Sequence, residues 1–304
     1  MTFEDACSEV LLYLRSIRGL SENSIISYGN DYAHALEFFG SDRAVDSISV
    51  FDLRSCVASL SEKKYSVPSI NRFIASIRTL FAYCKKFNYI EKNVASELKS
   101  LRSPKPLPKF MTGAEVDELC ALPSENPLLW ESRDRAIFEM LYSSGCRVSE
   151  LVSLKLSDFN GNYSSVIVRG KGSKDRKVYF EKDALIALEK YLAERKSRFP
   201  ECKVDFIFLN QRGSPLTSQG VWYILNRYTG PEGTGRHISP HTFRHTFATA
   251  MLSAGADIRV VQEMLGHSSI STTQRYTHVT TEKLKEIYWK CFPHSGRQNN
   301  KKED

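Results

Sequence analysis

The sequence of 304 residues contains no run of apolar residues long enough to cross a membrane, since such a run needs about 18 of them without a charge. Its start, MTFEDACSEV, is acidic and does not resemble a secretory signal peptide. We therefore expect a cytoplasmic protein that is not inserted in a membrane.

Clustered cysteines are also absent. The seven cysteines are scattered, and the shortest spacing between neighbours is the 26 residues from Cys120 to Cys146. This spacing contains no metal knuckle and no redox pair, so we expect reduced thiols. The chain also lacks a carboxylate pair placed for a metal ion and a serine or cysteine at a nucleophile elbow.

A zinc site on a helix is one interpretation of His237, His241 and His245, which repeat every four residues. Pro240 argues against it. Residues before a proline are pushed away from helical geometry, so His237 is expected to lie outside the helix. We expect no metal ion.

The glycine-rich turn at Lys171 resembles a phosphate-binding loop only in part. That motif needs glycine at position 165 and serine or threonine at position 172, where the chain has Ser165 and Gly172. We therefore expect no nucleotide cofactor, and no cofactor of any kind.

What is present indicates a globular protein of two domains. Apolar residues make up 41% of the chain and charged residues 25%, and the length is about twice that of a usual domain. Three prolines in residues 103–109 remove backbone donors and favour an extended linker. We predict a helical domain over 1–102, this linker, a catalytic domain over 110–292 and a polar tail over 293–304.

The first domain is predicted to contain four short helices, because apolar residues recur in it at helical spacing. Arg72, Arg78, Lys85 and Lys86 give one of these helices a basic face. The 42 basic and 35 acidic side chains of the chain leave a net charge of +7, which permits a polyanionic partner. The basic face is either a nucleic-acid contact or a solvated surface.

The second domain is predicted to be mixed. Alternating apolar residues at 166–168 and 178–180 flank a turn-rich stretch, which predicts a β-hairpin with Lys171 at its tip. Helices are expected before and after it, and the fold class is mainly α with a small β-sheet. The helical patterns before Thr217 occupy 113–121, 131–143, 147–154 and 183–198.

Polar residues are predicted near several helix ends. Ser239 and Pro240 are favoured at the start of a helix, and from there His241 and Arg244 fall on one face while Phe243 falls on another. We therefore expect the polar face to lie outside the core. The alternative is that these two residues merely cap the helix and face solvent.

Two more helix ends follow. Gly266 is predicted to end a helix that Asp257 caps, with His267 directly after it. The capping-box pattern at residues 271–274 then opens a helix that holds Tyr276. A histidine and a tyrosine are thus presented within nine residues of each other, where they can face a shared cleft.

A further arginine is predicted at the start of a helix. Gly145 is expected to end one helix, which places Arg147 just past it and opens the next. Glu150 either holds Arg147 in place or only caps that helix, since a surface ion pair of this kind contributes little.

The resulting set suits an attack on a phosphodiester. Guanidinium groups match the nonbridging oxygens, on which negative charge builds up. A tyrosine becomes a strong nucleophile when a histidine takes its proton, and the leaving sugar oxygen needs a proton that a lysine can supply. Cationic side chains then replace a metal ion. The residues are Arg147, Lys171, His241, Arg244, His267 and Tyr276.

At these residues the chain resembles the tyrosine recombinases, and most closely their Xer-type branch. The resemblance spans the second domain, and the helical first domain, which would bind the core DNA site, and the total length suit the same family. The motifs that carry it are SGCRVSEL, GKGSKDR, SPHTFRHTFAT and LGHSSISTTQRYTHV.

The resemblance implies roles for the six residues. Tyr276 would attack the scissile phosphate of duplex DNA and form a 3′-phosphotyrosyl link, with release of a 5′-hydroxyl. Arg147, Arg244 and His267 would hold the phosphate. Lys171 would protonate the leaving oxygen, and His241 would assist proton transfer at Tyr276. Neither ATP nor metal is then required.

The resemblance also implies a tetramer on two DNA recombination sites, made of one protein or shared with a paralogue. An Xer enzyme separates chromosome dimers. Two alternatives are an integrase of a phage, transposon or integron, and a noncatalytic DNA-binding regulator. The last predicted helix, over residues 282–292, docks either on a neighbouring protomer or on its own domain.

The chain departs from the family pattern at a few positions. Cys146 and Ala250 stand where leucine and histidine are more common, and neither change removes a proposed catalytic group. Arg275 precedes Tyr276 where an apolar residue is common. Its positive charge either assists ionisation of the tyrosine or faces solvent. The sequence does not give the target DNA site.

Overall fold

The structure is a computed structural model that divides into two compact units, Met1–Pro106 and Leu107–Asp304. Each unit is described by itself below. The residues that the structure describes are 1–102, 110–125, 130–159, 163–169, 175–231, 234–236, 238–266 and 280–293. Among them, no helix combines the length and the apolar character needed to cross a membrane.

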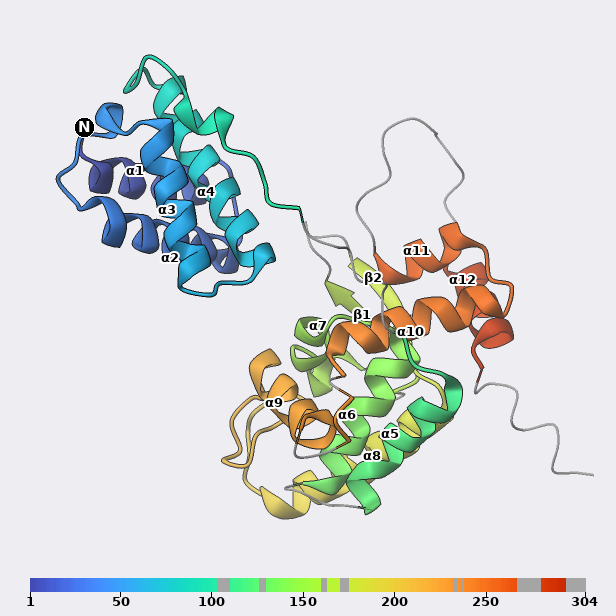
Figure 1. The fold of residues 1–304 in the computed structure, drawn as a ribbon. Coiled ribbons are helices and arrows are strands. Elements are labelled where there is room, and N and C mark those ends of the chain that lie inside the picture. Colours follow the sequence, from blue (N-terminus) through green and yellow to red (C-terminus); the bar gives the residue numbers. More distant parts are fainter. Residues whose placement is uncertain are drawn as a thin grey trace, which may run out of the picture. The chain divides into compact units, whose positions relative to one another are not determined.

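Four α-helices form most of the described part of the first unit (Figure 1). The fourth helix packs against each of the other three and contributes a continuous apolar face to the core. Serine and threonine side chains cap several of the starts, as their preference for these positions predicts. The helices are α1 (Phe3–Ser16), α2 (Glu22–Phe39), α3 (Val50–Glu62) and α4 (Val67–Lys86).

The basic residues of α4 have partners inside the first unit. Arg72 donates to the carboxylate of the buried Asp31, with an Nη2 to Oδ1 distance of 2.8 Å. Lys86 donates to the hydroxyl of Tyr13 at 3.0 Å. Arg78 and Lys85 donate to the backbone carbonyls of Leu98 and Glu91. These side chains therefore hold the helix to its neighbours, a use that neither of our two interpretations included.

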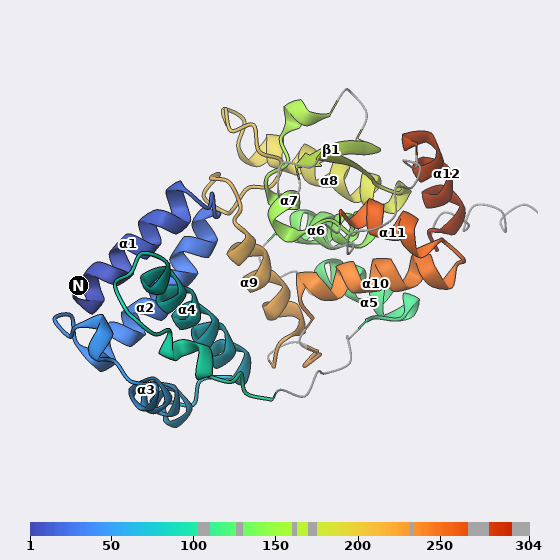
Figure 2. The ribbon, with the colours of Figure 1, turned by 90° about the horizontal axis from the view of Figure 1, so that it is seen from above.

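The second unit is built around α6 (Glu131–Ser144), which packs against α5 (Gly113–Glu125), α8 (Lys182–Arg198) and α10 (Pro240–Ser253) (Figures 1 and 2). Nearly every residue of α6 is buried. A helix surrounded on several sides has no solvent face, which explains why its apolar periodicity is weak in the sequence.

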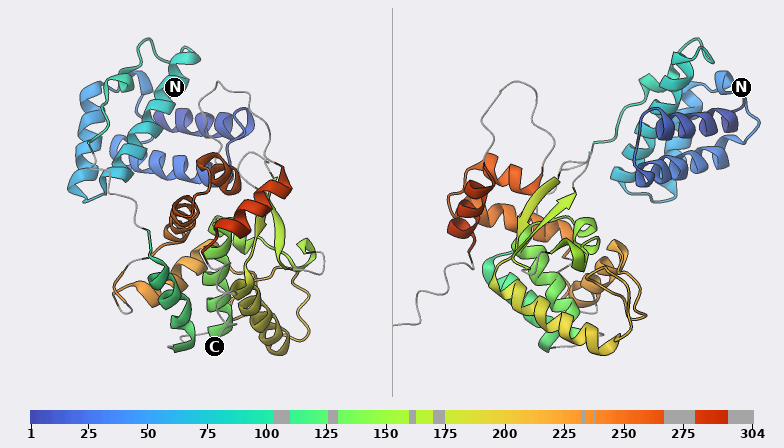
Figure 3. Two further views of the ribbon diagram at one scale, coloured as in Figure 1. Left: turned by 90° about the vertical axis from the view of Figure 1, so that its right-hand side faces the viewer. Right: turned by 180° about the vertical axis from the view of Figure 1, so that it is seen from behind.

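The hairpin consists of β1 (Ser165–Arg169) and β2 (Asp175–Tyr179), which pair antiparallel. Val166 lies opposite Val178 in the register, and Val168 lies opposite Arg176. The strand β2 packs against α11 (Ile258–Leu265) and α12 (Thr281–Cys291), as Figure 3 shows. This unit also contains the α-helices α7 (Val148–Val152) and α9 (Ser218–Thr229) and a short 3-10 helix over Leu156–Asp158.

The helix α12 packs on its own unit. Tyr288 is fully buried, and its hydroxyl donates to the backbone carbonyl of Ser143 at 2.9 Å. Its ring stacks on the rings of Phe292 and Phe247, with centroids 5.3 and 6.4 Å apart. In this structure the second of our two alternatives for the last helix therefore holds.

The predicted fold class is confirmed, since the described residues are mainly helical with one small sheet. The predicted helices lie within a few residues of the observed ones. The largest difference is at α5, which runs four residues past its predicted end at 121 and includes Pro123. Strand β1 extends one residue beyond the predicted run 166–168 at each end, whereas β2 begins three residues before the predicted run 178–180 and ends at Tyr179, which leaves Phe180 outside it. The predicted domain limits stay predictions.

Candidate active site

A glycine turn positions Arg147. Gly145 ends α6 in the left-handed conformation, with φ of 58°, as its position in the sequence predicts. A Cβ atom at Gly145 would lie 2.5 Å from Cδ1 of Phe247, so the turn also needs glycine for close packing. Arg147 then takes the N-cap position of α7, where its side chain is 32% exposed.

Glu150 holds Arg147 at two points. The backbone N–H of Arg147 donates to Oε2 of Glu150 at 2.7 Å, and Nη1 of Arg147 donates to Oε1 at 2.8 Å. The carboxylate thus caps the helix and orients the guanidinium. Both of the roles that we weighed for Glu150 are present together.

Arg244 is buried, contrary to our expectation for the polar face of its helix. Its side chain reaches away from α10 to the ends of two other helices, where Nη1 donates to the carbonyl of Gly145 at 2.8 Å and Nη2 donates to the carbonyl of Leu265. The carbonyls at a helix C-terminus lack partners within the helix and carry partial negative charge. The expectation was wrong for Arg244, because the ends of α6 and α11 cover it, whereas His241 on the same predicted face is exposed.

A third arginine, Arg176 of β2, belongs to the same cluster. Its Nη1 and Nη2 donate to Oε1 and Oε2 of Glu150 at 2.8 and 2.7 Å, and its Nε donates to the carbonyl of Met264 at 2.8 Å. The side chains of Arg176 and Glu150 are only 9% and 5% exposed. The two residues form a buried, bidentate ion pair.

The end of α11 receives all three arginines. Its last carbonyls accept in order from three different guanidiniums, Met264 from Arg176, Leu265 from Arg244, and Gly266 from Arg147 at 3.3 Å. Gly266 ends the helix with φ of 65°, as the sequence predicts. We call Arg147, Glu150, Arg176 and Arg244 the arginine cluster.

The charges of the arginine cluster act on one another. Burial, together with the positive charges of the neighbouring Arg147 and Arg176, lowers the pKa of Arg244 to about 10. Burial alone would raise the pKa of Glu150, but hydrogen bonds and charge from Arg176 and Arg147 outweigh it and lower this pKa. Three guanidiniums and one carboxylate leave a net charge of +2, so the cluster can attract a phosphate.

Three of the six predicted site residues are described. The structure brings Arg147 and Arg244 together at the end of α11, while His241 is exposed near the start of α10, in the second position of that helix. Lys171, His267 and Tyr276 lie outside the described residues, as does Arg275.

Sequence reasoning missed the role of Arg176, although the motif GKGSKDR contains it. The alternation of side chains between the two faces of the strand could have revealed this role. Residues 176 and 178 point to the same face of β2, and Val178 is buried, so a basic residue on that face must have a buried partner.

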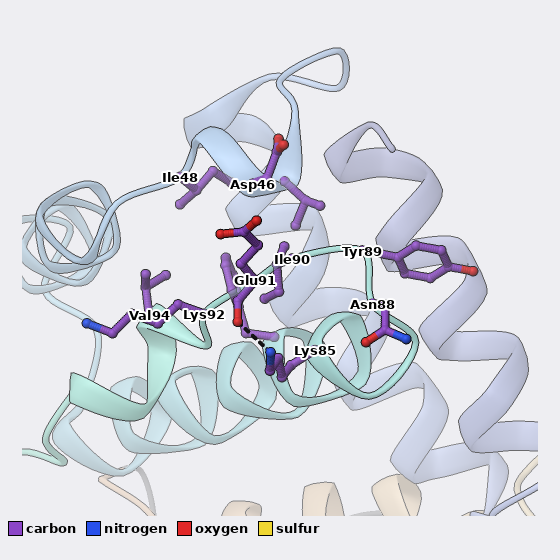
Figure 4. A pocket seen from close by; sticks show the side chains of 11 residues that line it. Asp46, Ile48, Lys85, Asn88, Tyr89, Ile90, Glu91, Lys92 and Val94 are labelled. Carbon is purple, nitrogen blue, oxygen red and sulfur yellow. Dashed lines mark hydrogen bonds between the residues drawn. The ribbon is translucent and has the colours of Figure 1, made fainter.

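The first unit contains a pocket of about 560 Å³, drawn in Figure 4. Apolar residues such as Ile48 and Ile90 line it together with charges of both signs, and Lys85 donates to the backbone carbonyl of Glu91. The pocket contains none of the predicted site residues. No group of three histidine, cysteine or acidic residues in the described parts of the chain is arranged to hold a metal ion.

Comparison with known proteins identifies both parts of the chain. The phage integrase family matches residues 109–283, and the N-terminal SAM-like domain of phage integrases matches residues 9–88. The chain is 41% identical over 297 residues to the tyrosine recombinase XerC of Treponema denticola, which covers 94% of this chain and 97% of that protein. It is 37% identical to the tyrosine recombinase XerD of Listeria monocytogenes, over 95% of this chain and 99% of that protein.

A solved structure supports the fold. A lambda integrase tetramer bound to a Holliday junction superposes with a TM-score of 0.68 and covers 91% of this chain and 80% of that one, at 17% identity. At this identity the likeness shows the fold alone. The identity to XerC over nearly the whole length carries more, because it includes both domains. The chain therefore belongs to the phage integrase family and is a site-specific recombinase of the Xer type, an enzyme that cuts and rejoins DNA strands.

Proposed function

We propose that Tyr276 is the nucleophile and that the arginine cluster binds the scissile phosphate. The phenol oxygen forms a bond to phosphorus while the bond to the 5′-oxygen breaks, which leaves a 3′-phosphotyrosyl link and a 5′-hydroxyl. Attack by the hydroxyl of a second strand reverses the step and exchanges strands. The energy of the phosphodiester is kept in the link, so the reaction needs no ATP.

One observation carries this proposal. Arg147 and Arg244 lie 97 residues apart in the sequence, yet their guanidiniums bond to the neighbouring carbonyls of Gly266 and Leu265. Two positive groups held this close repel each other, and this repulsion adds to burial, the larger cause, in lowering the pKa of Arg244. An anionic ligand would relieve that repulsion, and a phosphate offers oxygens that match guanidinium geometry.

The remaining roles follow from chemistry. His267 directly follows Gly266 in the chain and would add a third donor to the phosphate. Lys171 would give its proton to the departing 5′-oxygen, and His241 would accept the proton of the tyrosine. These assignments rest on the family resemblance and on residue type.

The resemblance also supports a proposal for the assembly. We infer that residues 1–102 and 110–292 form two domains that close on duplex DNA, and that four protomers act on two recombination sites, as lambda integrase forms a tetramer on a junction. The relatives named XerC and XerD favour a paralogous partner and a role in separating chromosome dimers. Such a substrate places the enzyme in the bacterial cytoplasm.

A nicked suicide duplex tests the nucleophile. When the nick lets the freed 5′-strand diffuse away, the covalent adduct accumulates and survives denaturant. Tyr276→Phe should abolish the adduct and leave DNA binding intact, because only one hydroxyl is removed. An adduct formed by the Phe variant would show that another residue is the nucleophile. Sequencing the DNA trapped in cells by the wild-type protein supplies the target site for the duplex.

A further inference from the structure

Arg176 belongs to the arginine cluster, and its side chain is only 9% exposed. Its guanidinium bonds to Glu150, which also holds Arg147, and to the carbonyl of Met264, which is next to the Leu265 carbonyl that accepts from Arg244. We propose that Arg176 is a positioning residue for DNA cleavage, which acts through Glu150 and the end of α11 to set the direction and the effective charge of Arg147. This inference rests on the proposed role of Arg147 in binding the phosphate.

Arg176 affects the positive charge that Arg147 can present to a phosphate. Glu150 lies 2.8 Å from Nη1 of Arg147, and a carboxylate that served Arg147 alone would cancel the charge that the phosphate is to meet. Arg176 places a second guanidinium across both oxygens of the same carboxylate. The negative charge is then shared between two arginines, and Arg147 keeps part of its attraction for an anion.

Arg176 also affects the direction in which the guanidinium of Arg147 points. An isolated carboxylate in the first turn of α7 can rotate, and the guanidinium it holds rotates with it. Arg176 fixes both carboxylate oxygens, and its Nε also bonds to the carbonyl of Met264. The same short stretch of backbone receives Arg244 and Arg147 at the next two carbonyls. Arg176 thus fixes the position of the carboxylate relative to the end of α11.

The lack of a side chain at Gly266 leaves space for Arg176. A Cβ atom at Gly266 would lie 3.1 Å from Cδ of Arg176, which is tighter than most such contacts. Gly266 therefore meets two needs, the left-handed end of α11 and room for the arginine stem. The pairing of Val168 with Arg176 in the hairpin fixes the strand from which this side chain extends.

Lysine cannot replace these contacts in full. The planar guanidinium makes two parallel bonds to the carboxylate and a third bond from Nε, whereas an ammonium group is a compact charge. Arg176→Lys keeps the positive charge beside Glu150 and loses part of the geometry that fixes the carboxylate. Arg176→Met loses both the charge and the geometry.

The test measures the single-turnover rate of adduct formation by the full-length protein on the nicked duplex with the trapped site, beside DNA affinity by mobility shift. We expect Arg176→Met to slow adduct formation by about 100-fold, the effect of a small misplacement of a positioned group, with DNA affinity nearly unchanged. Arg176→Lys should recover part of that loss. A purely structural arginine would change thermal stability and leave the rate of the folded fraction unchanged.

Arg133 offers a matched control. Its side chain is 3% exposed, it bonds to the carboxylate of Asp134 through Nε and Nη2, and its Nη1 donates to the carbonyl of Leu209. It is more deeply buried than Arg176 and has the same kinds of partner, a carboxylate and a backbone carbonyl, at another place in the unit. Arg133→Met should lower stability and leave the rate of adduct formation unchanged.

A double-mutant cycle with Arg147→Ala shows the route of the effect. If Arg176 acts through Arg147, the double variant is no slower than Arg147→Ala alone. Equal rates of wild type and Arg176→Met, or losses that multiply in the double variant, would overturn the inference. If Arg147→Ala formed the adduct at the wild-type rate, this result would instead refute the proposed role of Arg147 in binding the phosphate. If Arg176→Met does not fold, Arg176→Lys in the same cycle decides.

Discussion

The cores of the two units differ in the charge they contain. Among the described residues of Met1–Pro106, the buried polar side chains are Asp31 and Ser76, which bond to each other. The described part of Leu107–Asp304 buries twelve, six times as many in a unit less than twice as long. They include Arg133, Glu150 and Arg244.

Buried ions destabilise a fold unless they are paired and hydrogen-bonded. The first unit avoids that cost by keeping its arginines at the surface, where Arg72 reaches inward only as far as Asp31. The second unit buries paired charges, and Arg244 donates to the carbonyls at the ends of α6 and α11. The comparison teaches that packing orients a buried guanidinium in this unit, as our proposal for the scissile phosphate requires of Arg244.

The comparison predicts the largest effect for a buried arginine of the proposed site. Arg244→Ala should slow adduct formation on the nicked duplex by about 100- to 1000-fold, because one preorganised phosphate donor is lost. The control is Arg195→Ala, which removes another buried arginine that donates to backbone carbonyls, those of Val204 and Phe206. Equal losses of rate in the two folded variants would contradict the comparison.

Gly145→Ala tests how tightly the second unit is packed under its charges. A left-handed alanine combined with overpacking against Phe247 is expected to reduce the free energy of unfolding by about 2–4 kcal/mol. Urea titration measures it. Gly113→Ala is the control, because nothing lies near the position of its Cβ. An unchanged midpoint for Gly145→Ala would show that Phe247 moves aside without cost.

Glu139 is a buried acidic residue without a role in the proposed reaction, because it lies in the second unit but outside the arginine cluster. Burial, reinforced by the nearby Glu181, raises its pKa from 4.5 to about 7. Between these values the folded protein binds a proton that the unfolded chain has released. The stabilisation is complete below the unfolded pKa and is lost as the pH rises through 7.

Glu139→Gln imitates the protonated form at every pH. We expect the variant to exceed the wild type in free energy of unfolding by about 2–3 kcal/mol at pH 8, with the difference vanishing below pH 4.5. Urea titrations at a series of pH values measure this. A difference independent of pH would show that Glu139 is not the titrating group.

Arg72→Ala should give the smallest effect and tests the other side of the comparison. The arginine side chain is 53% exposed, and Ser76 still donates to Asp31 in the variant. We expect a loss of about 1–2 kcal/mol in the free energy of unfolding, and an unchanged rate of adduct formation at saturating enzyme. A slower rate at saturation would show that the basic residues of α4 take part in the chemistry.

The sequence allowed prediction of local features that depend on residue type. Gly145 and Gly266 end helices because glycine takes positive φ at little cost, and both ends were predicted. The phosphate chemistry could be inferred because arginine, lysine, histidine and tyrosine recur in motifs. None of these inferences needs contacts between distant segments.

Features that depend on tertiary contacts could not be predicted. Arg244 is buried because the ends of α6 and α11 meet over it, and no periodicity within α10 shows this. Arg176 was missed for the same reason, since its partners Glu150 and Met264 lie 26 and 88 residues away. The positions of Lys171, His267 and Tyr276 stay predictions.

Phe247 connects the last helix to the arginine cluster. Its ring lies against the turn at Gly145, whose carbonyl accepts from Arg244, and it also packs against the rings of Tyr288 and Phe292. A protein shortened before Thr281 would keep all four residues of the arginine cluster and lose the rings of Tyr288 and Phe292 that pack on Phe247. For anyone who engineers this enzyme, the start of α12 is therefore a poor place to cut.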